Sequence, residues 1–189
     1  MRKPDEDDWK KMRRLLGYLK RTIKVPLILR SDILNVLKWW VNASYAAHDD
    51  MWRHTGGTMS MGKGGRGSII SIPKKQKLNT KSSLEAKLIR VDDAMPRMLW
   101  IRYFLEAQGY GIDENILYQD NMSVMLLEKN GKKSRPKNSK HLNVHYYLIK
   151  SRVETGDVVI EHCPTEKMLG NTFTNPLQGE LFRKPGQKS

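Results

Sequence analysis

The chain has 189 residues, of which 39% are hydrophobic and 29% are charged. This size suits one principal globular domain of roughly 130–150 residues with peripheral segments. Lys and Arg outnumber Asp and Glu by 34 to 20, and the formal net charge is +14. Such a charge favours an anionic partner, nucleic acid before a membrane surface, because Lys and Arg that neutralise phosphates release condensed counterions.

Cysteine content and hydropathy exclude several classes of protein. The single cysteine, Cys163, excludes an internal disulfide framework and a multi-cysteine zinc site, and it suits a reducing compartment. No stretch approaches the about 18 apolar residues of a membrane span, and acids stand near the start of the chain where a signal peptide is apolar. We expect an intracellular protein, cytoplasmic or nuclear, with no membrane and no disulfide partner.

Three stretches contain Lys and Arg but no Asp or Glu: 9–31, 51–84 and 129–153. Any one such run is more often a solvated surface than a binding site. Three of them in one short chain favour binding to a polyanion.

The first half of the chain predicts one helix and three strands. Residues 5–21 place acids first, cations later and apolar side chains at helical spacing, which indicates an amphipathic helix. Pro26 ends that pattern, and residues 27–40 predict a connector with a short strand pair whose apolar side packs on the main domain. The runs VLKWWVNASYA, HTGGTMSMG and GSIISIPKKQ predict an antiparallel meander, with a hairpin turn at 63–67.

The second half alternates helices and strands. Ser82 and Glu85 form a capping-box pattern ahead of a helix from about 83 to 108, which Pro96 is expected to kink. The runs ENILYQDN and DVVIEHCPT predict two more strands, and MSVMLLEKNG, HLNVHYYLIKSRVETG and MLGNTFTNPL predict three more helices. Residues 130–140 predict a basic loop that buries no apolar surface.

Four polar positions stand in distinctive motifs: Asn42 in WVNASYA, Glu85 in TKSSLEAK, Asp120 in QDNMSV and Asn171 in GNTFTNPL. These segments resemble the ribonuclease H domain of copia-type LTR-retrotransposon Pol polyproteins, where the motifs are WxDASxA, TKSSxEAE, QDNxSA and ADxxTKPL. The opening DDWKKMRRLLGYLK similarly resembles the connector that follows reverse transcriptase in those polyproteins. Together the motifs extend over nearly the whole chain.

The resemblance implies an α/β, ribonuclease H-like fold. Its five-stranded mixed sheet combines an antiparallel meander with crossover units, and helices flank it. We expect a connector helix and short linker at 1–36, the ribonuclease H-like domain at 37–178 and a basic tail at 179–189.

The same resemblance implies the chemistry. Hydrolysis of RNA in an RNA/DNA hybrid by two Mg²⁺ ions, or Mn²⁺, needs clustered carboxylates to offset the repulsion between the ions. The family has acids at all four positions, whereas this chain has amides at Asn42 and Asn171. Glu85 and Asp120 remain as metal ligands, so we predict weak metal binding and little or no hydrolysis, as in a degenerate active site.

Each of these residues also has an ordinary structural role open to it. Glu85 suits its capping box, Asp120 suits a turn after a strand, and Asn42 suits a hydrogen-bonded position in a core. Asn171 suits the surface of a helix. The joint placement of the four residues in the family motifs favours the active-site interpretation.

His141 and His145 have the i, i+4 spacing of a zinc site, but the glutamate of HExxH is missing. The resemblance implies instead that His141 contacts the substrate or the product. Trp39 and Trp40 are expected in the core, and Cys163 is expected to be a small buried hydrophobe.

The partners implied are an RNA/DNA hybrid or duplex and the reverse transcriptase portion of the same polyprotein. Nine cations are candidates for nucleic-acid binding: Lys74, Lys75, Lys77, Lys81, Lys132, Lys133, Arg135, Lys137 and Lys140. Three alternatives stay open: a non-enzymatic nucleic-acid-binding module, a still active ribonuclease, and a translated relic with no selected function. A copy inside an active element implies a location in virus-like particles.

Overall fold

The computed structural model describes residues 3–24, 29, 31–44, 54–62, 67–75, 83–120 and 140–170. Its elements are α1 (Glu6–Thr22), β1 (Val36–Ser44), β2 (His54–Ser60), β3 (Ile70–Lys75), α2 (Ser83–Ala107), β4 (Glu114–Gln119), α4 (Lys140–Glu154), β5 (Val159–His162) and the 3-10 turn η3 (Thr165–Lys167).

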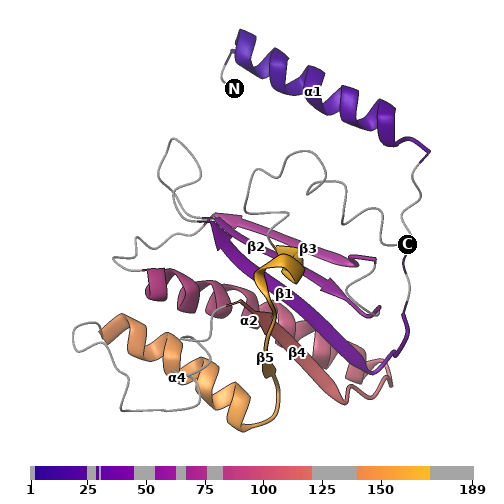
Figure 1. The fold of residues 1–189 in the computed structure, drawn as a ribbon. Helices are drawn as coiled ribbons and strands as arrows, with labels where there is room; N and C mark the ends of the chain where they lie inside the picture. The colour runs from indigo at the N-terminus through magenta and orange to yellow at the C-terminus, as the bar shows by residue number, and fades with distance from the viewer. Residues whose placement is uncertain are drawn as a thin grey trace.

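The five strands form one open sheet in the order β3-β2-β1-β4-β5 (Figure 1). The β1–β2 and β2–β3 pairs are antiparallel, whereas the β1–β4 and β4–β5 pairs are parallel. Helix α2 crosses over from the meander to β4, and α4 crosses over from β4 to β5. This arrangement confirms the ribonuclease H-like fold, a mixed sheet of antiparallel meander and crossover units with flanking helices.

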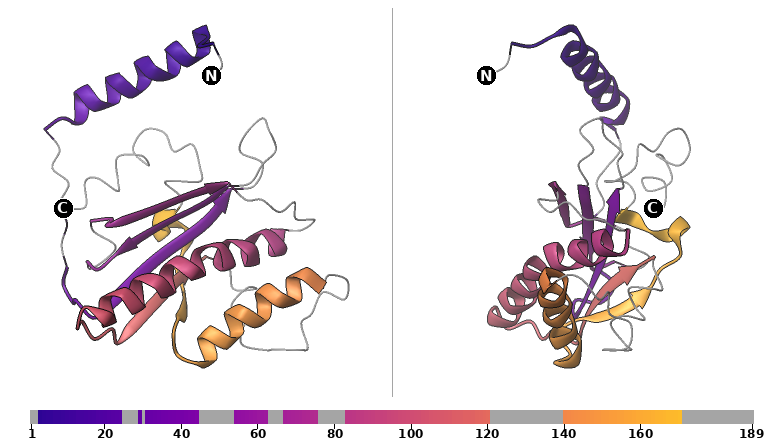
Figure 2. Two further views of the ribbon diagram at one scale, coloured as in Figure 1. Left: turned by 180° about the vertical axis from the view of Figure 1, so that it is seen from behind. Right: turned by 90° about the vertical axis from the view of Figure 1, so that its left-hand side faces the viewer.

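The sheet has its main core on one face and a smaller cluster on the other. Alternate residues of β1, namely Leu37, Trp39 and Val41, are fully buried in the main core with α2. Trp40 lies in the second cluster, with Cys163 and Met168. Figure 2 shows α2 and α4 on one side of the sheet and η3 on the other. Because both of its faces are covered, β1 is almost continuously apolar.

Helix α2 runs along the sheet and supplies the other half of the main core. Its buried residues Val91, Met95, Met98 and Ile101 follow the three-to-four spacing of one helical face. The prediction of a helix from about 83 to 108 is confirmed. Pro96 lies inside the helix and is exposed to solvent.

Helix α1 has the expected amphipathic pattern but buries none of its residues. It begins with a capping box, in which the Asp5 side chain accepts from the backbone of Asp8 and the Asp8 side chain accepts from the backbone of Asp5. Trp9 is 63% exposed. In both views of Figure 2 the helix lies apart from the sheet.

Of the connector expected at 27–40, residues 36–40 belong to β1, whereas the described residues before them, 29 and 31–35, contain no strand, so the expected strand pair is wrong there. The backbone there serves other partners: the Asn35 carbonyl accepts from the Asp113 and Glu114 N–H groups. Ile33 and Leu34 are exposed, so the expected packing of this connector on the main domain is also wrong for them. Four other expected features, the turn at 63–67, the helix after Asp120, the basic loop and the last helix, lie wholly or mostly outside the described residues.

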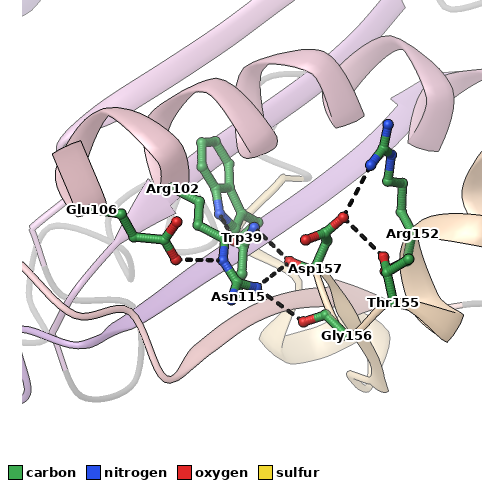
Figure 3. Close-up of polar contacts among 8 residues, drawn as sticks. All are labelled: Trp39, Arg102, Glu106, Asn115, Arg152, Thr155, Gly156 and Asp157. Atoms are coloured by element: carbon green, nitrogen blue, oxygen red, sulfur yellow. Dashed lines mark hydrogen bonds and ion pairs between the residues drawn. The ribbon is translucent and has the colours of Figure 1, made fainter.

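A polar network fastens α2 to the turn between α4 and β5 (Figure 3). The Arg102 guanidinium donates to the carbonyl oxygens of Gly156 and Asp157, each at 2.9 Å, and to the Glu106 carboxylate at 2.9 Å. Asn115 joins the same network, since its amide donates to the Asp157 carbonyl and accepts from the indole of Trp39 at 2.8 Å. This network holds one end of the sheet.

No helix in the described ranges is long and apolar enough to cross a membrane.

Candidate active site at the carboxyl ends of two parallel strands

The parallel pairing of β1 with β4 stops at one level, and polar residues follow it on both strands. The last pair is Trp40 with Tyr118, whose rings stack with centroids 5.0 Å apart. Asn42 and Asp120 each come two residues after that pair. In open α/β sheets, ligands bind beyond the carboxyl ends of such strands. Two of the four predicted site positions therefore meet where this fold places a site.

A third residue lies between them. Arg90 extends from α2, and its guanidinium donates from Nη1 to Asn42 Oδ1 at 2.6 Å. Its Nη2 donates to Gln119 Oε1 at 2.5 Å and makes an ion pair with Asp120 Oδ1 at 3.2 Å. One arginine from the helix thus joins the ends of both strands. We call these four residues the Arg90 cluster.

The Arg90 cluster is shielded from water. The Arg90 side chain is 0% exposed and that of Asp120 is 16% exposed, while Asn42 and Gln119 are buried. A buried charge is costly to desolvate unless an opposite charge and hydrogen bonds surround it. Asp120 supplies the opposite charge and the two amide oxygens supply neutral acceptors, so the guanidinium is held firmly.

The other two predicted positions are only partly described. Glu85 lies in the first turn of α2, but its side chain is outside the described part of the structure. Asn171 is also outside it. The residue before it, Gly170, lies against β1, where a Cβ built on it would stand 2.9 Å from the backbone nitrogen of Asn42. Only a glycine fits there without a shift, and the chain reaches the Arg90 cluster one residue before the fourth predicted position.

The described residues do not fit the pair of divalent ions that the family resemblance implies. Asn42 Oδ1 and Asp120 Oδ1 already accept from Arg90. A divalent ion placed about 4 Å from a guanidinium meets a repulsion of roughly 8 kcal/mol at an effective dielectric constant of ~20. Within the described ranges, no group of three or more His, Cys, Asp or Glu side chains is placed to hold a metal ion.

Sequence comparison connects this chain with transposon polyproteins. It is 28% identical over 190 aligned positions to the retrovirus-related Pol polyprotein from transposon RE2 of Arabidopsis thaliana, covering 100% of this chain and 13% of that protein. It is 27% identical over 179 positions to the corresponding polyprotein from transposon TNT 1-94 of Nicotiana tabacum, covering 95% of this chain and 13% of that one. The chain is therefore similar to one segment of transposon Pol polyproteins.

The chain spans about an eighth of the length of the curated relatives it matches. No protein-family model matches it. Among solved structures, LC11-RNase H1, isolated from compost by a metagenomic approach, aligns with a TM-score of 0.49 at 12% identity. That alignment covers 70% of this chain and 87% of the other.

The remaining predicted site residues stay predictions. His141 and Lys140 open α4, and Lys74 and Lys75 end β3, but none of these side chains is described. The other candidate cations lie outside the described residues: Lys77, Lys81, Lys132, Lys133, Arg135 and Lys137.

Three expectations about the core next to the site are confirmed. Trp39 and Trp40 are buried in the two clusters that cover the sheet. Cys163 is also buried, and burial is the main influence that raises the pKa of its thiol. Burial likewise raises the pKa of the neighbouring Tyr118 hydroxyl. These groups are neutral packing residues at neutral pH.

The sequence patterns did not identify Arg90 and Gln119 as residues of the site. An arginine on an amphipathic helix normally lies toward solvent, so Arg90 gave no sign of a buried role. The sequence signal for burial of Arg90 is its position between two apolar residues, Ile89 and Val91. Both are buried in the structure. Gln119 stands directly before Asp120, at the end of a strand that is buried at almost every position.

Proposed function

We propose that this chain is the ribonuclease H-like domain of a copia-type retrotransposon Pol polyprotein, and that it binds RNA/DNA hybrids but hydrolyses them very slowly or not at all. The observation that carries the proposal is the Arg90 cluster. At the position of the first-strand acid stands Asn42, whose oxygen accepts from a buried arginine. Asp120, a surviving acid, is paired with the same arginine.

The chemistry of the donor set supports the loss of hydrolysis. An amide oxygen is a possible ligand of Mg²⁺ or Mn²⁺ but brings no charge, so it does little to offset the repulsion between two cations. With Asn42 and Asn171 in place of acids, only Glu85 and Asp120 carry formal negative charge at the four positions. Binding of Mg²⁺ or Mn²⁺ is accordingly weak.

Binding to nucleic acid does not depend on those ions. The net charge of +14 gives long-range attraction to any polyanion. The acid-free stretches 51–84 and 129–153 contain many Lys and Arg residues and include β2, β3 and most of α4. A hybrid is read through its A-like shape, phosphates and 2′-hydroxyls rather than through its base sequence. The connector helix α1 is proposed to join the domain to the reverse transcriptase portion of the polyprotein.

Cleavage is tested with an end-labelled RNA/DNA hybrid in Mg²⁺ and, separately, in Mn²⁺. An active ribonuclease H serves as the positive control on the same substrate. We expect the control to degrade the RNA strand and this protein to leave it intact. Efficient cutting of the hybrid by this protein contradicts the proposed impairment and makes it a working ribonuclease.

Binding is tested by titrating the same hybrid at several salt concentrations. Neutralising Lys132, Lys133 and Arg135 together should weaken binding and reduce the slope of log affinity against log salt by about 2–3. The matched control neutralises three exposed cations of α1, Lys10, Arg13 and Lys20, and should change the slope less. Failure of the unaltered protein to bind any hybrid, even in low salt, refutes the nucleic-acid function.

A further inference from the structure

We propose that Arg90 is the resident cation of this site: its guanidinium takes the place of the divalent metal and keeps metal out. This inference rests on the proposed function in one respect, because it takes Asn42 and Asp120 as former metal-ligand positions. It goes further by naming a residue outside the family motifs as the cause. Loss of two acids is then only half of the change that silenced the site.

The contacts made by the guanidinium carry the argument. A cation in an ancestral site would bind oxygens from the first strand and from the end of the fourth. The guanidinium binds an oxygen from each of those two places, Asn42 Oδ1 at 2.6 Å and Asp120 Oδ1 at 3.2 Å. Gln119 Oε1 is a third described acceptor, at 2.5 Å. Three oxygens converge on one positive group, as they would on a metal ion.

Charge balance explains why an amide suits position 42. The described cluster contains one positive charge, on Arg90, and one negative charge, on Asp120. A neutral acceptor at Asn42 lets the guanidinium make a further hydrogen bond without adding a second negative charge to the described cluster. The Asn42 amide therefore suits the arginine as a neutral acceptor, and the arginine supplies the donor that the buried amide oxygen needs.

A consequence distinguishes this inference from simple loss of acids. Changing Asn42 to Asp in the presence of Arg90 gives the guanidinium a second carboxylate at 2.6 Å, and charge-assisted hydrogen bonds are stronger than neutral ones. The restored acid then binds the arginine rather than a metal ion. Recovery of a metal site requires the removal of Arg90 as well.

The test measures metal binding directly, by calorimetric titration with Mg²⁺ and by the shift in Tm between EDTA and excess Mg²⁺. The proteins compared are the wild type, the acid-restored variant (Asn42→Asp, Asn171→Asp), and the acid-restored variant that also carries Arg90→Met. We expect no Mg²⁺-dependent change in Tm for the first two. The third should be destabilised in EDTA, regain Tm in Mg²⁺ and bind the ion at least about tenfold more tightly than the other two.

Two further variants control for nonspecific effects on stability. Arg102→Met removes an arginine from the same helix at the other end of the sheet, and in the acid-restored background it should lower Tm without creating a response to Mg²⁺. Arg90→Lys keeps a cation but loses the planar fork. It should have a Tm between those of the arginine and methionine proteins and still show no response to Mg²⁺.

Two results overturn the proposal. One is a clear Mg²⁺-dependent rise in Tm in either protein that keeps Arg90, because the arginine then excludes nothing. The other is a folded Arg90→Met, acid-restored protein that ignores Mg²⁺. If that variant does not fold, the two proteins that keep Arg90 still test the proposal. A Mg²⁺-dependent rise in Tm in either one refutes it, and no change in Tm in both supports it.

Hybrid binding by the wild type separates this inference from the proposed function. A protein that shows the expected Mg²⁺ behaviour but binds no hybrid refutes the function and leaves Arg90 as the resident cation. A protein that binds hybrid and also binds Mg²⁺ tightly with Arg90 in place refutes the role of Arg90 alone.

Discussion

Two arginines of helix α2 anchor opposite ends of the same sheet, and their partners differ in kind. Arg102 is held mainly by backbone carbonyls, those of Gly156 and Asp157. Arg90 is held entirely, among its described contacts, by side chains. Backbone acceptors are present whatever the local sequence, whereas side-chain acceptors depend on the residue at each position. The Arg102 network therefore depends little on which side chains surround it, whereas the Arg90 cluster depends on three particular side chains.

Burial differs in the same direction. The Arg90 side chain is 0% exposed, whereas that of Arg102 is 17% exposed and its Glu106 partner lies one helical turn away. Near the surface, a polar group that loses one hydrogen bond can bind water instead. A buried charge cannot, so the two ends of the sheet should respond differently to substitution.

The largest expected effect comes from replacing each arginine by methionine. Arg90→Met should lower the free energy of unfolding by about 3–5 kcal/mol, because it removes the described counter-ion of the mostly shielded Asp120 carboxylate and the described donor to the Asn42 and Gln119 amide oxygens. Arg102→Met should cost about 1–3 kcal/mol. Urea titrations followed by circular dichroism give both values. An Arg102 effect as large as that of Arg90 would abolish the distinction between the two ends.

Gly170→Ala tests the tight approach of the chain to the Arg90 end of the sheet. The new Cβ would lie 2.9 Å from the backbone nitrogen of Asn42, so backbone must shift, and we expect a loss of about 1–3 kcal/mol in urea unfolding. The control is Gly17→Ala in α1, where nothing lies within 4 Å. It should raise helicity, with a gain of up to about 1 kcal/mol. Equal behaviour of the two variants contradicts the close packing at position 170.

Asp157 gives a smaller, pH-dependent effect at the Arg102 end. Burial acts to raise its pKa, but hydrogen bonds from Thr155 and Arg152 and the charges of Arg152 and Arg102 lower the pKa below its ordinary value. Its stabilising contribution is therefore present above the pKa of the unfolded chain and is lost as the pH falls through the folded pKa. Asp157→Asn should cost roughly 1 kcal/mol at neutral pH and almost nothing in strong acid.

The control for that measurement is Glu154→Gln, which removes a carboxylate paired with Lys150 at 3.3 Å on the surface. An exposed pair of this kind contributes little, so its pH profile should match that of the wild type. An Asp157→Asn effect that persists unchanged at low pH would mean that the aspartate acts through its shape rather than its charge.

The smallest effect concerns the thiol beside the Arg90 end. Burial raises the pKa of Cys163, and its backbone N–H donates to the Gln119 carbonyl at 2.7 Å. A thiol-specific reagent should react with the native protein much more slowly than with the urea-unfolded chain. Arg90→Met should accelerate the native reaction and Arg102→Met should not. Equal rates for the two variants would show that Arg90 does not keep this end closed.

Local pattern was enough to predict most of the fold. The helix expected at about 83–108 is found at Ser83–Ala107, and the strand expected within ENILYQDN is Glu114–Gln119. The helix has apolar residues at helical spacing, and the strand is a short run that is buried at almost every position. The connector before Val36 has apolar residues too, but Ile33 and Leu34 remain exposed, because composition alone does not supply a partner strand.

The centre of the candidate site could not be predicted in the same way. Arg90 lies 48 residues from Asn42 and 30 from Asp120, so its burial depends on where two distant strands stop pairing. Motif resemblance identified Asn42 and Asp120 because it aligns positions with a known pattern. It is silent about a residue that the pattern does not include, and a charged helix residue is ordinarily assigned to the surface.

The neighbouring tryptophans of β1 give the two faces of the sheet separate optical reporters. Trp39 is sealed in the layer under α2 and bonded to Asn115, whereas Trp40 stacks on Tyr118 in the layer under η3. Indole emission depends on local polarity, so variants in which Trp39 or Trp40 is the only one of the five tryptophans retained would each report the entry of water at one face of the sheet. Coincident thermal unfolding curves would mean that the two layers unfold together, and separate curves would mean that one layer unfolds before the other.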